Sequence, residues 1–125
     1  MTDDRSAIEA VVQTYLDGLH EGDVEKLASA FHPTSALTSE QDGELVVVPR
    51  QKWLDFVKGR PSAKSRSLSR YDEILQIDQS SQTSAFVKLK CAIPPLFFTD
   101  YLSLLKIEGR WQVVQKVYAT QKREP

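Results

Sequence analysis

The chain has 125 residues, a length that fits one domain burying roughly 65–70% of the surface its unfolded chain exposes. A net charge of −1 gives no overall attraction to nucleic acid or anionic membranes, and no apolar run approaches the ~20 residues of a membrane-spanning helix. The polar, acidic start is unlike a secretion signal, so we expect one cytoplasmic domain over residues 1–125, with no nucleic-acid or membrane partner.

Helices are expected in the first half of the chain. Apolar residues recur at helical spacing over about residues 3–20, which predicts an amphipathic helix that ends at Gly22. Asp23 can cap a second, shorter helix reaching about Ala30. A third short helix is predicted over Pro49–Lys58, because proline fits the first position of a helix.

Strands account for most of the remainder. Alternating and β-branched residues predict short strands over 35–38 and 45–48 and long ones over 69–78, 83–93 and the two arms of a hairpin within 98–118. The hairpin turns at Glu108-Gly109-Arg110, and Pro94-Pro95 ends the strand before it. Residues after Ala119 are polar and are expected to fray.

Both faces of the predicted hairpin are apolar. Tyr101 and Leu105 alternate with Leu102 and Leu104 along its first arm. Strict alternation along the second arm places Val113 and Lys116 on opposite faces. Helices can cover only one face of such a sheet, so the other face needs a second cover. We therefore expect a homodimer formed through a sheet face.

A basic segment follows the third helix. Residues 50–70 contain seven bases and one acid, Asp55: Arg50, Lys52, Lys58, Arg60, Lys64, Arg66 and Arg70. Such a run is most often a solvated surface, and its alternative interpretation is a patch for an anionic ligand or partner. No aromatic residue lies between Lys58 and Arg70, so the base-stacking part of a nucleic-acid site is missing there.

The order of elements and several motifs resemble the nuclear transport factor 2-like superfamily. Within it the chain is similar to the group called putative lumazine-binding, which is related to the SnoaL-like cyclases. The matching motifs are residues 19–23 (LHEGD), 31–33 (FHP), 42–50 (DGELVVVPR), 91–95 (CAIPP) and 98–106 (FTDYLSLLK). The resemblance implies an α+β fold in which N-terminal helices pack on a curved antiparallel sheet and leave a pocket at the open end of a cone.

The resemblance also implies which residues line that pocket, although it leaves open which alternate set on the sheet faces inward. Polar and aromatic side chains of the first and third helices and of the sheet are candidates for ligand binding: Tyr15, Leu19, Trp53, Phe56, Tyr71, Phe98, Tyr101, Ser103 and Lys116.

Candidate catalytic groups are few. Ketosteroid isomerase, another protein of this fold, uses a carboxylate base and an oxyanion hole made of a tyrosine and a protonated acid. Aligned by resemblance, Tyr15 takes the tyrosine position, but Ser39 and Ser103 take those of the base and the acid, and a serine cannot replace a carboxylate base. Asp100 remains as a base or as a partner of Lys116.

His32 is the other possible base, provided that it faces the cone; otherwise it ends the second helix. The two histidines, His20 and His32, have no paired spacing with each other or with Cys91, so no metal site is expected, and no cofactor motif is present. Cys91 is expected to be a small buried thiol, since no histidine lies near it in sequence.

Three functions fit these features. The one we favour is a small-molecule-binding protein with an aromatic-lined cone pocket. The alternatives are a cofactor-free cyclase, isomerase or hydrolase of the SnoaL-like type and a dimeric protein-interaction module that uses its sheet or the basic loop over residues 58–70.

Overall fold

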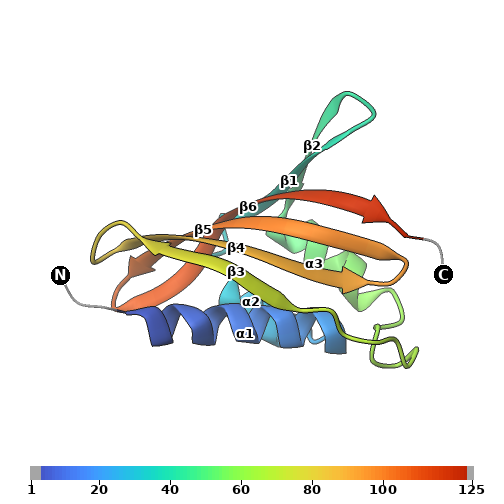
Figure 1. Cartoon of the computed structure of the whole chain (residues 1–125), viewed down its shortest axis with the longest axis horizontal. Coiled ribbons are helices and arrows are strands. Elements are labelled where there is room, and N and C mark those ends of the chain that lie inside the picture. The colour runs from blue at the N-terminus through green and yellow to red at the C-terminus, as the bar shows by residue number, and fades with distance from the viewer. Residues whose placement is uncertain (1–3, 124–125) are drawn as a thin grey trace.

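The computed structural model describes residues 4–123, and in this part of the chain three helices pack against one face of a six-stranded sheet (Figure 1). The helices are α1 (Arg5–Glu21), α2 (Val24–Ala30) and α3 (Arg50–Lys58). All three predicted helices are present, and the expected start of the first at residue 3 lies outside the described residues.

The boundary between α1 and α2 is fixed by two side-chain effects. Gly22 has φ +70°, and a Cβ there would lie 2.8 Å from the Cβ of Ser62, so glycine suits this position on both grounds. The carboxylate of Asp23 then accepts hydrogen bonds from the backbone N–H groups of Glu25 and Lys26 at 3.0 and 3.2 Å, which caps α2 as predicted.

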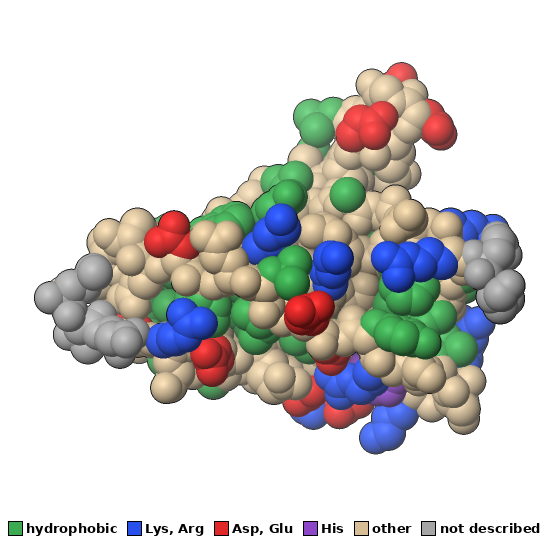
Figure 2. All heavy atoms as spheres, viewed as in Figure 1, with side chains coloured by type: hydrophobic (Ala, Val, Ile, Leu, Met, Phe, Trp, Pro, Cys, Tyr) green, Lys and Arg blue, Asp and Glu red, His purple; other side chains and the backbone are tan. Residues whose placement is uncertain are grey.

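The sheet has the order β2-β1-β6-β5-β4-β3. Its strands are β1 (Ala36–Gln41), β2 (Glu44–Pro49), β3 (Glu73–Gln79), β4 (Ser84–Ile93), β5 (Leu96–Ile107) and β6 (Arg110–Lys122). Strand β1 runs parallel to β6, and the remaining neighbours are antiparallel. In Figure 1 the β1–β2 hairpin extends beyond the long strands, and acidic side chains gather at its tip in Figure 2.

Several predicted strand limits are wrong: β1 continues to Gln41 rather than ending at residue 38, and β5 begins at Leu96 rather than at residue 98. Strand β3 begins at Glu73 rather than at residue 69. Strand β6 continues past Ala119 to Lys122, because the first residues of β5 supply its backbone partners and Leu96 pairs with Lys122. Pairing with a neighbouring strand therefore outweighs the polar composition of this end.

A β-bulge in β6 changes which side chains face the helices. Val114 is an extra residue opposite Ser103 and Leu104 of β5, so the alternation along β6 shifts there. Val113 before the bulge and Lys116 after it are both buried, at 0% and 4% exposure. The strict alternation expected from the sequence placed them on opposite faces, and that expectation is wrong.

The inner, helix-covered face of the sheet and the three helices enclose a continuous core. The rings of Tyr15, Phe31 and Trp53 lie at its centre, with centroids 5.2 Å apart for Tyr15–Phe31 and 4.9 Å apart for Phe31–Trp53. Tyr15 belongs to α1, Phe31 follows the last residue of α2, and Trp53 belongs to α3, so the three rings pack these helices together. The candidate site lies next to them.

Candidate functional site

A polar cluster is buried in this core. The hydroxyl of Tyr15 on α1 donates to Oδ2 of Asp100 on β5 at 2.5 Å, and Nζ of Lys116 on β6 donates to the Tyr15 hydroxyl at 2.8 Å. Lys116 Nζ also lies 3.5 Å from Asp100 Oδ2. Tyr15 and Asp100 are fully buried, so the opposite charges of Asp100 and Lys116 compensate each other in a region with little water.

Aromatic rings surround the ammonium group of Lys116. Its Nζ lies 4.8 Å from the ring centroid of Tyr118, 5.1 Å from that of Tyr15 and 5.6 Å from that of Trp53. Ring faces attract a cation, and the nearby carboxylate of Asp100 adds to this attraction. The ammonium group of Lys116 is therefore held between three ring faces and a carboxylate.

The rest of the cluster favours neutral hydroxyl and thiol groups. Burial, and then the negative charge of Asp100, raise the pKa of Tyr15 well above its usual value of 10.0. The Sγ of Cys91 lies 3.7 Å from Asp100 Oδ2, and burial raises the pKa of this thiol as well. Oδ1 of Asp100 has no hydrogen-bond partner among the described residues, so the protein solvates this carboxylate incompletely.

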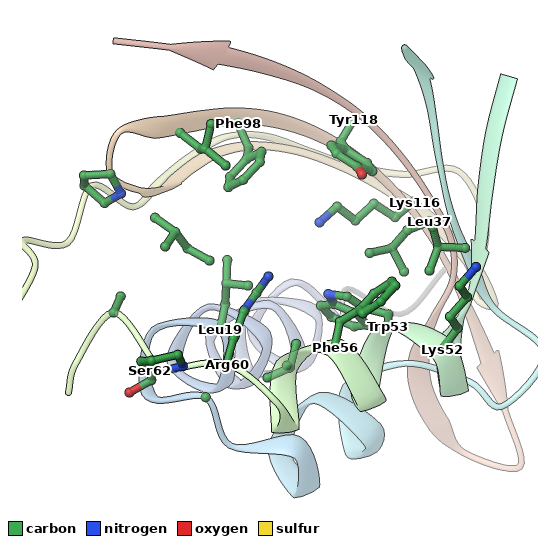
Figure 3. A pocket seen from close by; sticks show the side chains of 18 of the residues that line it. Leu19, Leu37, Lys52, Trp53, Phe56, Arg60, Ser62, Phe98, Lys116 and Tyr118 are labelled. Carbon is green, nitrogen blue, oxygen red and sulfur yellow. The ribbon is translucent and has the colours of Figure 1, made fainter. Parts of the chain in front are cut away.

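Lys116 connects the buried cluster to a cavity of about 750 Å³, which we call the cone cavity. The cavity lies between the inner face of the sheet and the helices, with Lys116 reaching in from the sheet (Figure 3). Its walls are largely apolar and aromatic, and include Leu19, Leu37, Trp53, Phe56, Phe98 and Tyr118. Lys116 is almost fully buried, whereas Phe56 is 54% exposed, so Lys116 marks the inner end and Phe56 the mouth.

Five of the residues expected to bind a ligand line the cone cavity: Leu19, Trp53, Phe56, Phe98 and Lys116. Tyr15 lies behind Lys116, in contact with it but not among the lining residues. Asp100 also lies behind Lys116 and does not line the cavity. The sequence offered two roles for Asp100, a base or a partner of Lys116, and the structure shows it paired with Lys116.

Tyr101, Ser103 and Tyr71 lie elsewhere. Tyr101 and Ser103 are exposed on the outer face of β5, because Asp100 and Leu102 take the inward positions between them. The acid beside Tyr15 is therefore Asp100, which corrects the alignment that placed Ser103 there. Tyr71 is half exposed and lines a separate hollow of about 550 Å³.

His32 does not line the cone cavity either. Its Nδ1 accepts a hydrogen bond from the backbone N–H of Thr34 at 3.1 Å and lies 2.8 Å from the Thr34 hydroxyl. These contacts hold the imidazole in the turn after α2, where it contributes to the local structure of the chain.

Several lining residues are not among the sequence candidates. Leu37 of β1 and Tyr118 of β6 reach the cavity through strand pairing, which no local pattern announces. Lys52, Arg60 and Arg66 also line it, and they belong to the basic segment over residues 50–70. The concentration of charge was visible in the sequence, but the direction in which each side chain points was not.

The described residues of the cavity wall include basic side chains but no acidic ones. Among the described residues that line it there is no Asp, Glu or His, so no conventional general base faces the cavity. Within residues 4–123, no group of three or more His, Cys, Asp or Glu side chains is placed to hold a metal ion. None of the helices in this part of the chain is long and apolar enough to cross a bilayer.

The family whose description reads "Putative lumazine-binding" matches residues 3–119. The chain belongs to this family. The match covers every helix and all but the last residues of the sheet, so the arrangement around the cone cavity is part of this putative lumazine-binding domain.

Individual relatives agree with this fold. The aldolase FrzH of Cladobotryum is 25% identical over 114 residues, which cover 90% of this chain and 87% of the relative. A nuclear transport factor 2-like protein of unknown function from Shewanella baltica is 28% identical, with a TM-score of 0.86 over 96% of this chain and 95% of that one. A structure described as a putative scytalone dehydratase, from Novosphingobium aromaticivorans, has 18% identity and a TM-score of 0.68 over 98% of this chain and 89% of that one, which shows a shared fold alone.

Proposed function

We propose that this protein binds a small, largely apolar molecule in the cone cavity, with Lys116 as the polar anchor at its inner end. The observation that carries the proposal is the position of Lys116 Nζ, which is held by Tyr15 and Asp100 at the inner end of a cavity of about 750 Å³. That volume lies within the ~300–1,000 Å³ typical of small-molecule sites, where few polar groups orient a ligand against apolar walls.

The lining suits a planar ligand such as a heterocycle or a polyketide-like molecule. Trp53, Phe56, Phe98 and Tyr118 supply ring surfaces from both the helices and the sheet (Figure 3). An ammonium group has three N–H donors, and Tyr15 accepts from one of them. A carbonyl oxygen of the ligand would accept a further hydrogen bond from Lys116.

Native mass spectrometry of protein purified from its own host tests the proposal, followed by release and identification of the bound molecule. Phe56→Ala removes an exposed ring from the mouth of the cavity and should lower ligand occupancy without affecting the fold. Leu45→Ala is the matched control, because Leu45 is 75% exposed and does not line the cavity. A protein that carries no molecule from its host and binds none from a library of planar compounds would contradict the proposal.

A second candidate function is carbonyl chemistry at the same site. It is favoured by the buried cluster of Tyr15, Asp100 and Lys116 and by the aldolase name of the FrzH relative. When a C–H bond next to a carbonyl breaks, negative charge develops on the carbonyl oxygen, and a preorganised ammonium would stabilise it. The proton would pass to water, since no carboxylate or imidazole is among the described lining residues.

Hydrogen–deuterium exchange tests this second candidate. Ketones that bind the protein would be incubated in D₂O, and exchange at the carbon next to the carbonyl followed by NMR. Catalysis predicts faster exchange with the wild type than with Lys116→Met, and Phe56→Ala should slow it by weakening binding. If a ketone binds but its exchange is not accelerated, the protein is a binding protein for the ketones tested and this chemistry is excluded for them.

We also propose that the protein forms a homodimer through the outer face of the sheet. Tyr101, Leu105, Ile107 and Val117 are 38–47% exposed there. Hydrophobic side chains reach the surface over the long strands, interspersed with basic ones (Figure 2). A second copy suits this face, because the exposed side chains of β5 between Tyr101 and Ile107 and of β6 from Gln115 to Val117 are uncharged. Lys88 of the neighbouring strand β4 lies over the ring of Tyr101 at the edge of this uncharged area. The same face would serve the third reading, a dimeric interaction module.

A further inference from the structure

Five of the seven bases in the segment over residues 50–70 fall into two groups in the structure, and Lys58 and Lys64 belong to neither. Arg50 and Arg70 are engaged within the protein. The guanidinium of Arg50 donates to the backbone carbonyls of Ala28 and Phe31, both at 3.0 Å. That of Arg70 pairs with two carboxylates, Asp72 Oδ2 at 2.5 Å and Asp17 Oδ1 at 3.0 Å. These two arginines have structural roles that account for their charge.

Lys52, Arg60 and Arg66 form the second group, and all three line the cone cavity. Neither Arg60 nor Arg66 makes a side-chain hydrogen bond or ion pair with any described residue, and Lys52 Nζ lies only over the ring of Phe56, at 5.9 Å. The side chain of Arg60 extends into the cavity from the wall opposite Lys116 (Figure 3). An unpaired guanidinium that points into a cavity has its donors available for a ligand.

The positive charge of the cavity is therefore not neutralised at its mouth. At the inner end, Asp100 lies 3.5 Å from Lys116 and compensates it. No Asp or Glu is among the described lining residues that could do the same for Lys52, Arg60 or Arg66. Partial burial lowers the pKa of the Arg60 guanidinium below its usual value, which is the effect expected of a cation without a partner.

We propose that the ligand of the cone cavity carries an anionic oxygen group, a carboxylate or a phosphate, bound by Arg60 together with Arg66 at the mouth. This inference rests on the proposed function, since it assigns the charge and the orientation of the molecule bound there. The planar guanidinium of Arg60 forms paired hydrogen bonds with either group, and the apolar body of the ligand extends inward towards Lys116. The resulting ligand class is an aromatic or alicyclic acid with its acidic group nearest the solvent.

Three probes with one aromatic body test the inference by calorimetric titration: 2-naphthoate, 2-naphthyl phosphate and the uncharged 2-naphthamide. We expect at least one anion to bind the wild type about tenfold more tightly than the amide, because charge-assisted hydrogen bonds are stronger than neutral ones. Added salt should lower the affinity for the anion and leave the affinity for the amide unchanged. The anion with the larger preference identifies the acidic group.

Variants locate the effect. Arg60→Gln, and independently Arg66→Gln, should reduce anion affinity several-fold and leave amide affinity unchanged. Lys64→Gln is the matched control, because it removes one positive charge from the same exposed loop but does not line the cavity. An anion affinity that is undiminished in both arginine variants, or equal affinities of the three probes for the wild type, would overturn the inference and leave the proposed function intact. If none of the probes binds, the proposed function itself fails for this class of compound.

Discussion

Tyr15 and Asp100 lie 85 positions apart in the sequence, yet the hydroxyl of the first donates to Oδ2 of the second at 2.5 Å in the fully buried core. Lys116 completes this arrangement by donating to the same hydroxyl. One buried cation and one buried carboxylate are thus joined through a neutral phenol, and each depends on the others for compensation.

The first prediction concerns this dependence. Asp100→Asn removes the charge that compensates Lys116 and should lower the free energy of unfolding by about 3–5 kcal/mol, because a buried cation is left without its partner. Adding Lys116→Met should recover a large part of that loss, since both charges are then absent. Urea denaturation of the wild type, both single variants and the double variant measures the coupling. Losses that simply add would contradict it.

Stability at high pH provides a second prediction. Burial raises the pKa of Tyr15 above 10.0, so above about pH 10 the unfolded chain releases a phenolic proton that the folded protein retains. The contribution of Tyr15 to stability should therefore be complete below pH 10 and fall above it, by at most about 1.4 kcal/mol per pH unit. Tyr15→Phe should flatten this dependence. The comparison between the two proteins isolates Tyr15, because the buried thiol of Cys91, with its raised pKa, acts with the same sign in both.

A third prediction concerns Trp111, which is 3% exposed and donates through Nε1 to Asp4 Oδ2 at 2.9 Å. Trp111→Ala should lower the free energy of unfolding by about 3–5 kcal/mol, because it opens a cavity in the core. Thermal and urea denaturation would both report the loss. Leu45→Ala on the exposed hairpin is the control, and an equally small effect of the two substitutions would show that Trp111 does not support the core.

The outer sheet face provides a fourth prediction. Tyr101→Lys combined with Val117→Lys should convert the proposed dimer to a monomer, because four extra positive charges would then meet across the two-fold axis. Light scattering after size-exclusion chromatography measures the mass, and the unfolding midpoint of the variant shows that the monomer is folded. A wild type that remains monomeric across micromolar concentrations would rule out the dimer.

Much of the fold could be predicted from local sequence pattern. Helical spacing over α1, the capping residue Asp23 and the proline before α3 gave the helices, and alternating residues gave the long strands. The motifs at residues 19–23 and 91–95 indicated the superfamily. The prediction was least accurate at the ends of strands, such as β6 beyond Ala119, where a partner strand decides whether the backbone is paired.

The site was predicted only in part, because its residues come together through long-range pairing. Leu19, Trp53 and Phe98 were identified as lining residues from the elements that carry them. Tyr101 and Ser103 were candidates from a strand whose inward side chains the sequence left open, and the structure turns them outward. A side chain on a strand has two possible directions, and local sequence does not distinguish them when both faces are apolar.

The amino-acid sequence by itself determined the helices, the strands and a basic segment beside an aromatic core. The tertiary structure decided how these features are combined into a site. The extra residue Val114 shifts the alternation of β6, so Lys116 turns inward to Tyr15 and Asp100, and the loop after α3 directs Arg60 into the same cavity. The physical reason is that a bulge and a loop direction are fixed by the strands and helices packed against them, which lie far away in the sequence.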